Sequence, residues 1–194
     1  MRKKTHCRTW GMMLFSISLT AAAGPAAEML AYTCAGCHGT DGSSVGPSSP
    51  HIADMNPEYF VESMKAYKSD ERNPTIMNRI AKGYSDEQIE AMAGFFSKQK
   101  LHLSAQQYDA DKAKLGAEYH EEYCEKCHED GGRDASDGGT LAGQWMPYLH
   151  FAMSDFRSGS REMTKKMKTK LEKMQKEHGD AAIDAVIQYY GSQQ

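Results

Sequence analysis

The chain has 194 residues, with 23 Lys and Arg against 26 Asp and Glu and a formal net charge of −3. This length allows one large domain or two small domains of roughly 80 to 100 residues each. The acidic balance argues against a nucleic-acid-binding protein, because such proteins need a basic surface.

Residues 1–23 have the layout of a cleaved secretory signal peptide. Four basic side chains precede an apolar stretch from Trp10 to Leu19, and an alanine run offers a cleavage site before Gly24. The apolar stretch is too short for a spanning helix, which needs about 20 residues. We expect an exported chain that begins near Gly24, has a net charge of −7 and spans no membrane. An uncleaved N-terminal anchor is the alternative.

The spacing of apolar residues predicts an all-α protein. We expect helices at 26–32, 57–68, 85–98, 112–123, 147–157 and 180–192. Loops rich in Gly, Ser and Asp lie at 39–50 and 129–140. No segment gives a convincing strand.

The four cysteines outside the signal peptide form two copies of one motif. These are Cys34-Ala-Gly-Cys37-His38 and Cys124-Glu-Lys-Cys127-His128. Cys-x-x-Cys-His is the attachment sequence of c-type haem. Two thiols one helical turn apart can each add across a haem vinyl group, while the adjacent histidine becomes an axial iron ligand. The sequence therefore predicts two covalently bound haem c groups, which would complete two otherwise polar cores.

Three other interpretations of Cys-x-x-Cys are a structural disulfide, a thioredoxin-like redox pair and half of a zinc site. A redox pair would need a strand–helix sheet context that this sequence lacks. A zinc site would join pairs 90 residues apart, far beyond the usual spacing of about 15 to 20. The repeated histidine favours haem attachment.

The two halves repeat beyond the motif. A shift of 90 places Cys34 on Cys124, and a shift of 89 places Tyr59-Phe60 on Tyr148-Leu149. This run-on similarity indicates a duplicated domain. We expect a first domain at 24–97, a polar linker at 98–111 and a second domain at 112–194.

The sixth iron ligand of an electron-transfer haem is commonly Met or a second His. Met77 lies in a segment expected to be irregular, and Met167 follows it at the same shift of 90 as the cysteines. Met163 is the rival of Met167, because four extra residues separate Met167 from the last helix. Met64 and Met153 also match across the halves, but they lie in helical apolar patterns typical of a core.

At this point the chain resembles the tandem two-haem class I cytochromes c of the periplasm. The strings EMLAYTCAGCHGTDGSSVGPSSPHIADM, TIMNRIAKGYS and LAGQWMPYLHFAMSDFR are similar to the cytochrome subunit of flavocytochrome c sulfide dehydrogenase. The resemblance implies two tandem class I cytochrome c domains, with Cys34, Cys37, His38 and Met77 serving one haem and Cys124, Cys127, His128 and Met167 the other.

The resemblance also implies partners. An FAD-containing flavoprotein subunit would oxidise sulfide and form a heterodimer with this chain, which would pass the electrons to a soluble acceptor such as another cytochrome c. FAD would be bound only by that partner. The haem propionates would lie near the domain interface.

The class pattern orients the ligating imidazole with a proline carbonyl. Gly46-Pro47 could supply this carbonyl to His38, whereas no proline lies between His128 and Pro147. The orienting bond of His128 is therefore open.

Two alternative functions remain at this stage. The first is a free-standing two-haem carrier that serves a terminal oxidase. The second is a haem enzyme, such as a thiosulfate dehydrogenase or a peroxidase, in which one iron has an unusual or missing sixth ligand. The four residues inserted after Met167 are the feature that points to the second.

Overall fold

A computed structural model describes residues 26–73, 75–134 and 138–194, so the expected signal peptide lies outside the described residues. Across these ranges the chain is all-helical, without a strand, as the sequence predicted. No described helix is both long and apolar enough to cross a bilayer. The helices are α1 Ala27–Ala31, the 3₁₀ turn η1 Tyr32–Cys34, α2 Ala35–His38, α3 Pro57–Lys68, α4 Ile76–Ala81, α5 Asp86–Phe96, α6 Ala110–Tyr123, α7 Glu129–Gly132, α8 Met146–Ser158, α9 Lys165–His178 and α10 Ala181–Ser192.

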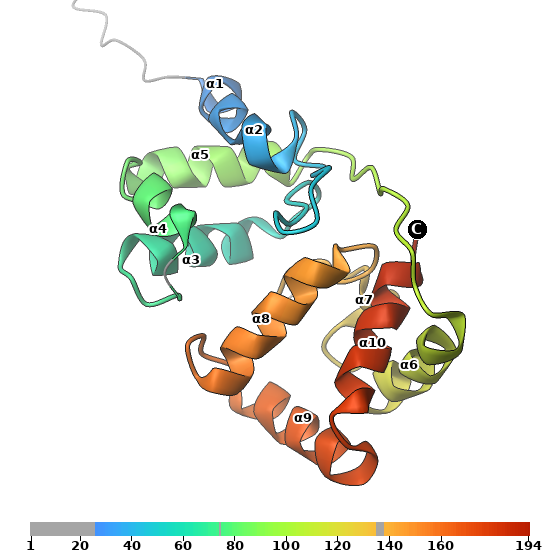
Figure 1. Cartoon of the computed structure of the whole chain (residues 1–194). Coiled ribbons are helices and arrows are strands. Elements are labelled where there is room, and N and C mark those ends of the chain that lie inside the picture. Colours follow the sequence, from blue (N-terminus) through green and yellow to red (C-terminus); the bar gives the residue numbers. More distant parts are fainter. Residues whose placement is uncertain (1–25, 74, 135–137) are drawn as a thin grey trace, which may run out of the picture.

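The helices form two groups that repeat one arrangement (Figure 1). In the first group α1 packs on α5, and α3 contacts both α4 and α5. In the second group α6 packs on α10, which also contacts α8 and α9. An extended segment joins the two groups (Figure 1). The pairing of first and last helices therefore occurs once in each half.

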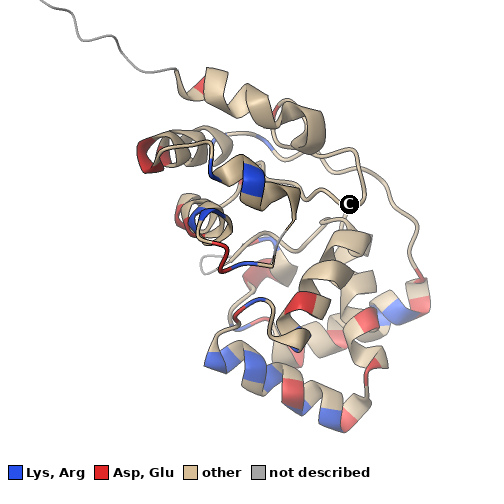
Figure 2. Ribbon diagram, turned by 60° about the vertical axis from the view of Figure 1, so that its left-hand side comes forward, with Lys and Arg blue, Asp and Glu red and all other residues tan. Residues whose placement is uncertain are grey.

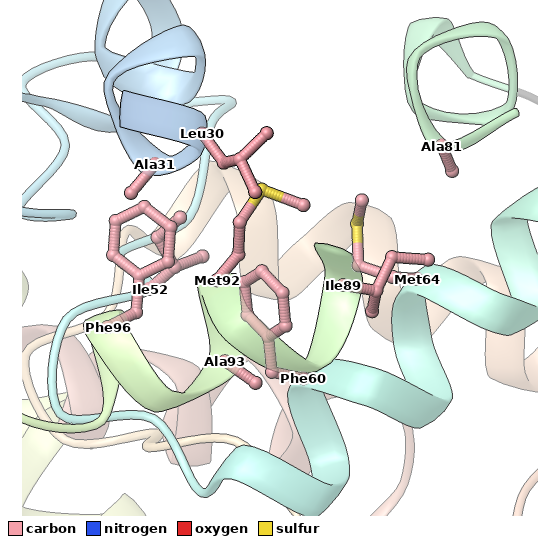
Figure 3. Packing of buried hydrophobic residues seen from close by; sticks show 10 residues of the cluster. All are labelled: Leu30, Ala31, Ile52, Phe60, Met64, Ala81, Ile89, Met92, Ala93 and Phe96. Atoms are coloured by element: carbon pink, nitrogen blue, oxygen red, sulfur yellow. The ribbon is translucent and has the colours of Figure 1, made fainter. Parts of the chain in front are cut away.

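The first core is built on α5. A capping box between Ser85 and Gln88 fixes its start, which satisfies backbone N–H groups that have no partner within the helix. Ile89, Met92 and Phe96 are fully buried at helical spacing. Figure 3 shows these side chains beside residues from α1 and α3, and Ala81 of α4 belongs to the same cluster. This core holds the first haem motif at its edge.

The second core depends on the close crossing of α6 and α10. Gly116 lies at this crossing, where a Cβ atom would be 2.0 Å from the carbonyl oxygen of Ala185. Only glycine allows the two backbones to approach this closely. On α10, Ile183, Val186 and Tyr190 are buried at helical spacing. The crossing positions the end of α6, where the second haem motif begins.

The short helix α7 lies at the start of 129–140, which was expected to be a loop, and two further helices also differ from the sequence-based expectation. Met77 was expected in an irregular segment, but it lies on α4, which begins with a capping box between Thr75 and Asn78. The four residues inserted after Met167 were expected to form about one added helical turn, but residues 165–178 form the continuous helix α9. Both helices follow a threonine N-cap whose signal is short and easily missed.

A glutamine links the two halves in a buried position. The backbone N–H of His51 donates to Gln144 Oε1 at 2.9 Å, and Gln144 Nε2 donates to the carbonyl of His51 at 3.2 Å. Beside them, Trp145 Nε1 donates to the carbonyl of Ser44 at 3.2 Å. Gln106, from the connecting segment, donates to the carbonyl of Gln144 at 3.0 Å. These bonds fix the orientation of one half against the other.

Replacement of Gln144 with leucine is expected to lower the free energy of unfolding of the two-haem protein by about 1 to 3 kcal/mol. The cause is that two backbone groups of His51 lose their partner while they remain buried. Chemical denaturation followed by circular dichroism measures this change, and Gln107→Ala, at an exposed position, is the control. Equal stability of the two variants would contradict the role of Gln144.

Candidate functional site

His38 is held in the form that binds a metal. It ends α2, is only 8% exposed, and its Nδ1 lies 2.8 Å from the carbonyl oxygen of Pro50. Because a carbonyl only accepts, Nδ1 carries the proton and Nε2 keeps a lone pair for a ligand. Burial lowers the pKa of His38 and so favours the neutral ring. The carbonyl of Pro47 was expected to accept this bond; the structure places the carbonyl of Pro50 there instead.

The four thiols are unpaired, and two of them have raised pKa values. All four cysteines of the motifs are free. Burial raises the pKa of Cys34, and it raises that of Cys124 to about 11. A redox pair needs a lowered thiol pKa, so this environment does not fit one. The described residues also hold no group of three or more His, Cys, Asp or Glu side chains that could bind a metal ion.

The second motif is fixed by a histidine that the sequence left without a role. His120 is 2% exposed, and its Nδ1 lies 2.9 Å from the hydroxyl of Tyr190. Its Nε2 lies 2.5 Å from Glu125 Oε2, inside the motif. Glu125 in turn accepts from the backbone N–H groups of Asp130 and Gly131. This network ties the motif to α10 and to the turn that follows it.

The structure also locates the candidate methionines. Met77 packs against the first core, and its backbone N–H donates to Thr75 Oγ1 at 3.1 Å. The backbone N–H of Met167 donates to the cap of α9, Thr164 Oγ1, at 3.2 Å, from the third helical position where Met77 has the second. Met163 precedes that cap and packs against the second core. Met77 and Met167 thus both lie in the first turn of a helix, while Met163 shares with Met77 the packing against a core.

Two arginines, one from each half, each donate a hydrogen bond to a tyrosine of the other half. Arg72 lies over the ring of Tyr67 and donates to the hydroxyl of Tyr148 at 3.3 Å. Arg161 lies over the ring of Phe156 and donates to the hydroxyl of Tyr59 at 2.5 Å. Neither guanidinium has a carboxylate within 4.0 Å among the residues that the structure describes. The pair places two positive charges between the halves.

Neither arginine was predicted from the sequence, although the repeat contains the signal. Arg72 and Arg161 are related by the same shift of 89 that relates Tyr59 to Tyr148. A charged residue repeated in register with aromatic residues indicates a role in the interface between the repeats.

The donor set fits c-type haem. Each half presents two unpaired thiols followed directly by an imidazole, and His38 has the tautomer that leaves Nε2 available. An anionic group at the junction would find two guanidinium donors, whose geometry suits carboxylates.

Comparisons with known proteins agree with this interpretation. The family model described as cytochrome c matches residues 23–100. Cytochrome c4 of Pseudomonas aeruginosa is 30% identical over 165 residues, which cover 77% of this chain and 81% of that protein. The crystal structure of reduced recombinant cytochrome c4 from Pseudomonas stutzeri superposes with a TM-score of 0.73 at 23% identity, over 89% of this chain and 100% of that chain.

Two other relatives have names that mention partners. The cytochrome subunit of sulfide dehydrogenase from Chlorobaculum tepidum is 44% identical over 69 residues, which cover 36% of this chain and 62% of that protein, less than two thirds of its length. The thiosulfate dehydrogenase electron acceptor from Thiomonas intermedia is 24% identical over 172 residues, covering 83% of this chain and 78% of that protein.

Proposed function

Because this chain belongs to the two-haem members of the cytochrome c family, with two tandem class I domains and two covalent haem c groups, we propose that it is the electron-transfer subunit of a sulfide-oxidising complex. Its partner in this proposal is a flavoprotein that binds FAD and forms a heterodimer with it. Electrons leave to a soluble acceptor, such as another cytochrome c. The complex works in the periplasm.

We assign the haem contacts by half. Cys34 and Cys37 hold the first haem, and Cys124 and Cys127 the second. The iron ligands are His38 with Met77 and His128 with Met167. The shared shift of 90 and the place of Met77 and Met167 in the first turn of α4 and α9 support this set. The division into 24–97, 98–111 and 112–194 belongs to the same proposal.

A bound haem supplies one-electron chemistry between its ferric and ferrous states, and His/Met ligation tends to raise its reduction potential. The chain determines the rest. The carbonyl of Pro50 holds the His38 ring as a neutral ligand. Arg72 and Arg161 provide positive charge between the halves, which suits the haem propionates. Because a histidine and a methionine side chain would hold each iron, the subunit would bind no substrate itself, and catalysis would lie in the partner.

The sulfide assignment depends on one observation, the 44% identity to the cytochrome subunit of sulfide dehydrogenase. Two haems in one chain would suit a flavin donor, because a two-electron donor can then release its electrons one at a time. An acceptor with a single haem would have to be reoxidised before it could take the second electron.

Rapid mixing of the chain, its flavoprotein and sulfide tests this function. We expect the flavoprotein to co-purify with the chain and sulfide to reduce both haems, because each iron accepts one electron. The flavoprotein alone and the two-haem chain alone are the controls. Reduction of only one haem would contradict the two-electron proposal.

A second candidate function is electron acceptance from a thiosulfate-oxidising enzyme. The similarity to a thiosulfate dehydrogenase electron acceptor, which extends over 83% of this chain, favours it. In that case the chain would purify without a flavoprotein, and thiosulfate with the matching enzyme would reduce it.

A further inference from the structure

The strongest local charge in this acidic chain lies on and beside α9. Residues 157–176 contain eight basic and two acidic side chains, whereas the rest of the chain from Gly24 onward has a net charge of −13. The exposed basic residues of the helix, which we call the α9 lysines, are Lys165, Lys166, Lys168, Lys170, Lys173 and Lys176. Figure 2 shows blue segments concentrated on this helix.

Most of the α9 lysines are not used in ion pairs. Lys173 pairs with Glu122 and Glu177, and Lys170 donates to a backbone carbonyl. Lys165, Lys166 and Lys168 lie within 4.0 Å of no carboxylate in the described part of the chain. Their positive charge is therefore exposed to solvent and free to attract an approaching anion or acidic protein.

The equivalent helix of the first half has a different surface. At a shift of 90, Ile76 and Ile80 of α4 correspond to Lys166 and Lys170 of α9, on either side of Met77 and Met167. Ile76 is 61% exposed and Ile80 is 37% exposed. The same structural position is thus apolar on α4 and basic on α9. We infer that the two helices face different surroundings.

The lysines also occupy an unfavourable place for stability. Lys165, Lys166 and Lys168 lie in the first turn of α9, where no acidic residue is present. The N-terminus of a helix carries partial positive charge and favours acidic side chains. Three lysines there oppose the helix dipole, so helix stability does not explain them.

We propose that the α9 lysines form the docking surface for an acidic electron acceptor that takes electrons from the second haem. This inference deepens the proposed function and rests on it. Exposed, hydrated lysines suit a transient partner, because charge complementarity mainly raises the rate of association. One electron would pass from ferrous iron to the acceptor, with no bond formed and no proton moved.

Oxidation of the fully reduced two-haem protein by ferricyanide, a trianion, tests this surface. The overall charge would repel ferricyanide, so salt would speed the reaction if electrons left from the general surface. If they leave beside α9, salt slows it. We expect the rate constant to fall about tenfold between about 10 mM and about 500 mM salt, as screening removes the local attraction.

The variant Lys165→Glu/Lys166→Glu/Lys168→Glu should reverse this dependence, so that salt speeds oxidation. Its unfolding temperature should rise, because glutamates suit the start of a helix. A control with the same net charge is Lys98→Glu/Lys100→Glu/Lys114→Glu, at three exposed positions, which should keep the wild-type dependence. A synthetic polyglutamate peptide should slow the oxidation of the wild type and the control, but not of the α9 variant.

Salt that speeds oxidation of the wild type, or equal behaviour of the two triple variants, would overturn the proposal. Haem counts and absorption spectra confirm that each variant is fully loaded. The assay starts from chemically reduced protein, so it remains informative even if the flavoprotein and sulfide reduce neither haem. In that case the flavoprotein would not be the electron donor, while the ferricyanide assay would still test the docking surface.

Discussion

A chain with Cys124→Ala and Cys127→Ala is expected to carry one haem instead of two and to lose the tertiary structure of its second half. Cys124 packs against the second core, next to the buried Tyr123, so a haem attached there would become part of that core. Loss of the haem should therefore destabilise this half by more than the roughly 3 to 5 kcal/mol that removal of one buried aromatic ring costs.

Haem content and hydrogen exchange measure this outcome. A pyridine haemochrome assay should give one haem per chain, and amide protection should fall in α6 and α10 but persist in α5. Lys126→Ala, at an exposed position inside the same motif, is the matched control and should keep two haems. Two haems in the double cysteine variant would show that the second motif is not the attachment site.

Met77→Ala is expected to remove half of the far-red absorption band that methionine gives to ferric haem. Loss of the thioether leaves the first iron open or bound by a weaker ligand, and its reduction potential should fall. Met167→Ala should remove the other half of the band. The two losses should be additive, because the two residues serve different irons.

Met163→Ala separates the two ligand candidates of the second half. Met163 packs against the second core, so its removal should cost stability while it leaves the band intact. A fully buried methionine contributes roughly 2 to 5 kcal/mol in this replacement, and the half-buried Met163 should contribute less. Loss of the band in Met163→Ala, but not in Met167→Ala, would make Met163 the ligand.

The haem motifs and the helices with clear apolar spacing could be predicted from the sequence. Residues 57–68 and 85–98 were expected to be helical, and α3 and α5 lie there. The reason is that these segments bury a continuous stripe, so their local pattern agrees with the tertiary packing.

The sequence did not predict α4 and α9, for physical reasons that differ. The helix α4 is only six residues long and depends on the caps of Thr75 and Asn78. In α9 only Leu171 and Met174 are buried. Among so many lysines, two apolar residues give too weak a helical pattern to detect. Such helices are stabilised mainly by tertiary contacts.

Some loop and junction contacts could not be predicted from the sequence either. The bond between His38 and the carbonyl of Pro50 depends on the path of the loop around His38, and Pro47 was expected in its place. The bonds of Gln144 to His51 join residues 93 positions apart. Local spacing carries no information about either arrangement.

The measurement that tests the central claim most directly is the anaerobic titration of the two-haem chain with sulfide in the presence of its flavoprotein. The proposal predicts that sulfide delivers two electrons per chain and that both haems become ferrous. If both haems stay ferric with sulfide and flavoprotein, while thiosulfate and a thiosulfate-oxidising enzyme reduce them, the sulfide assignment is wrong.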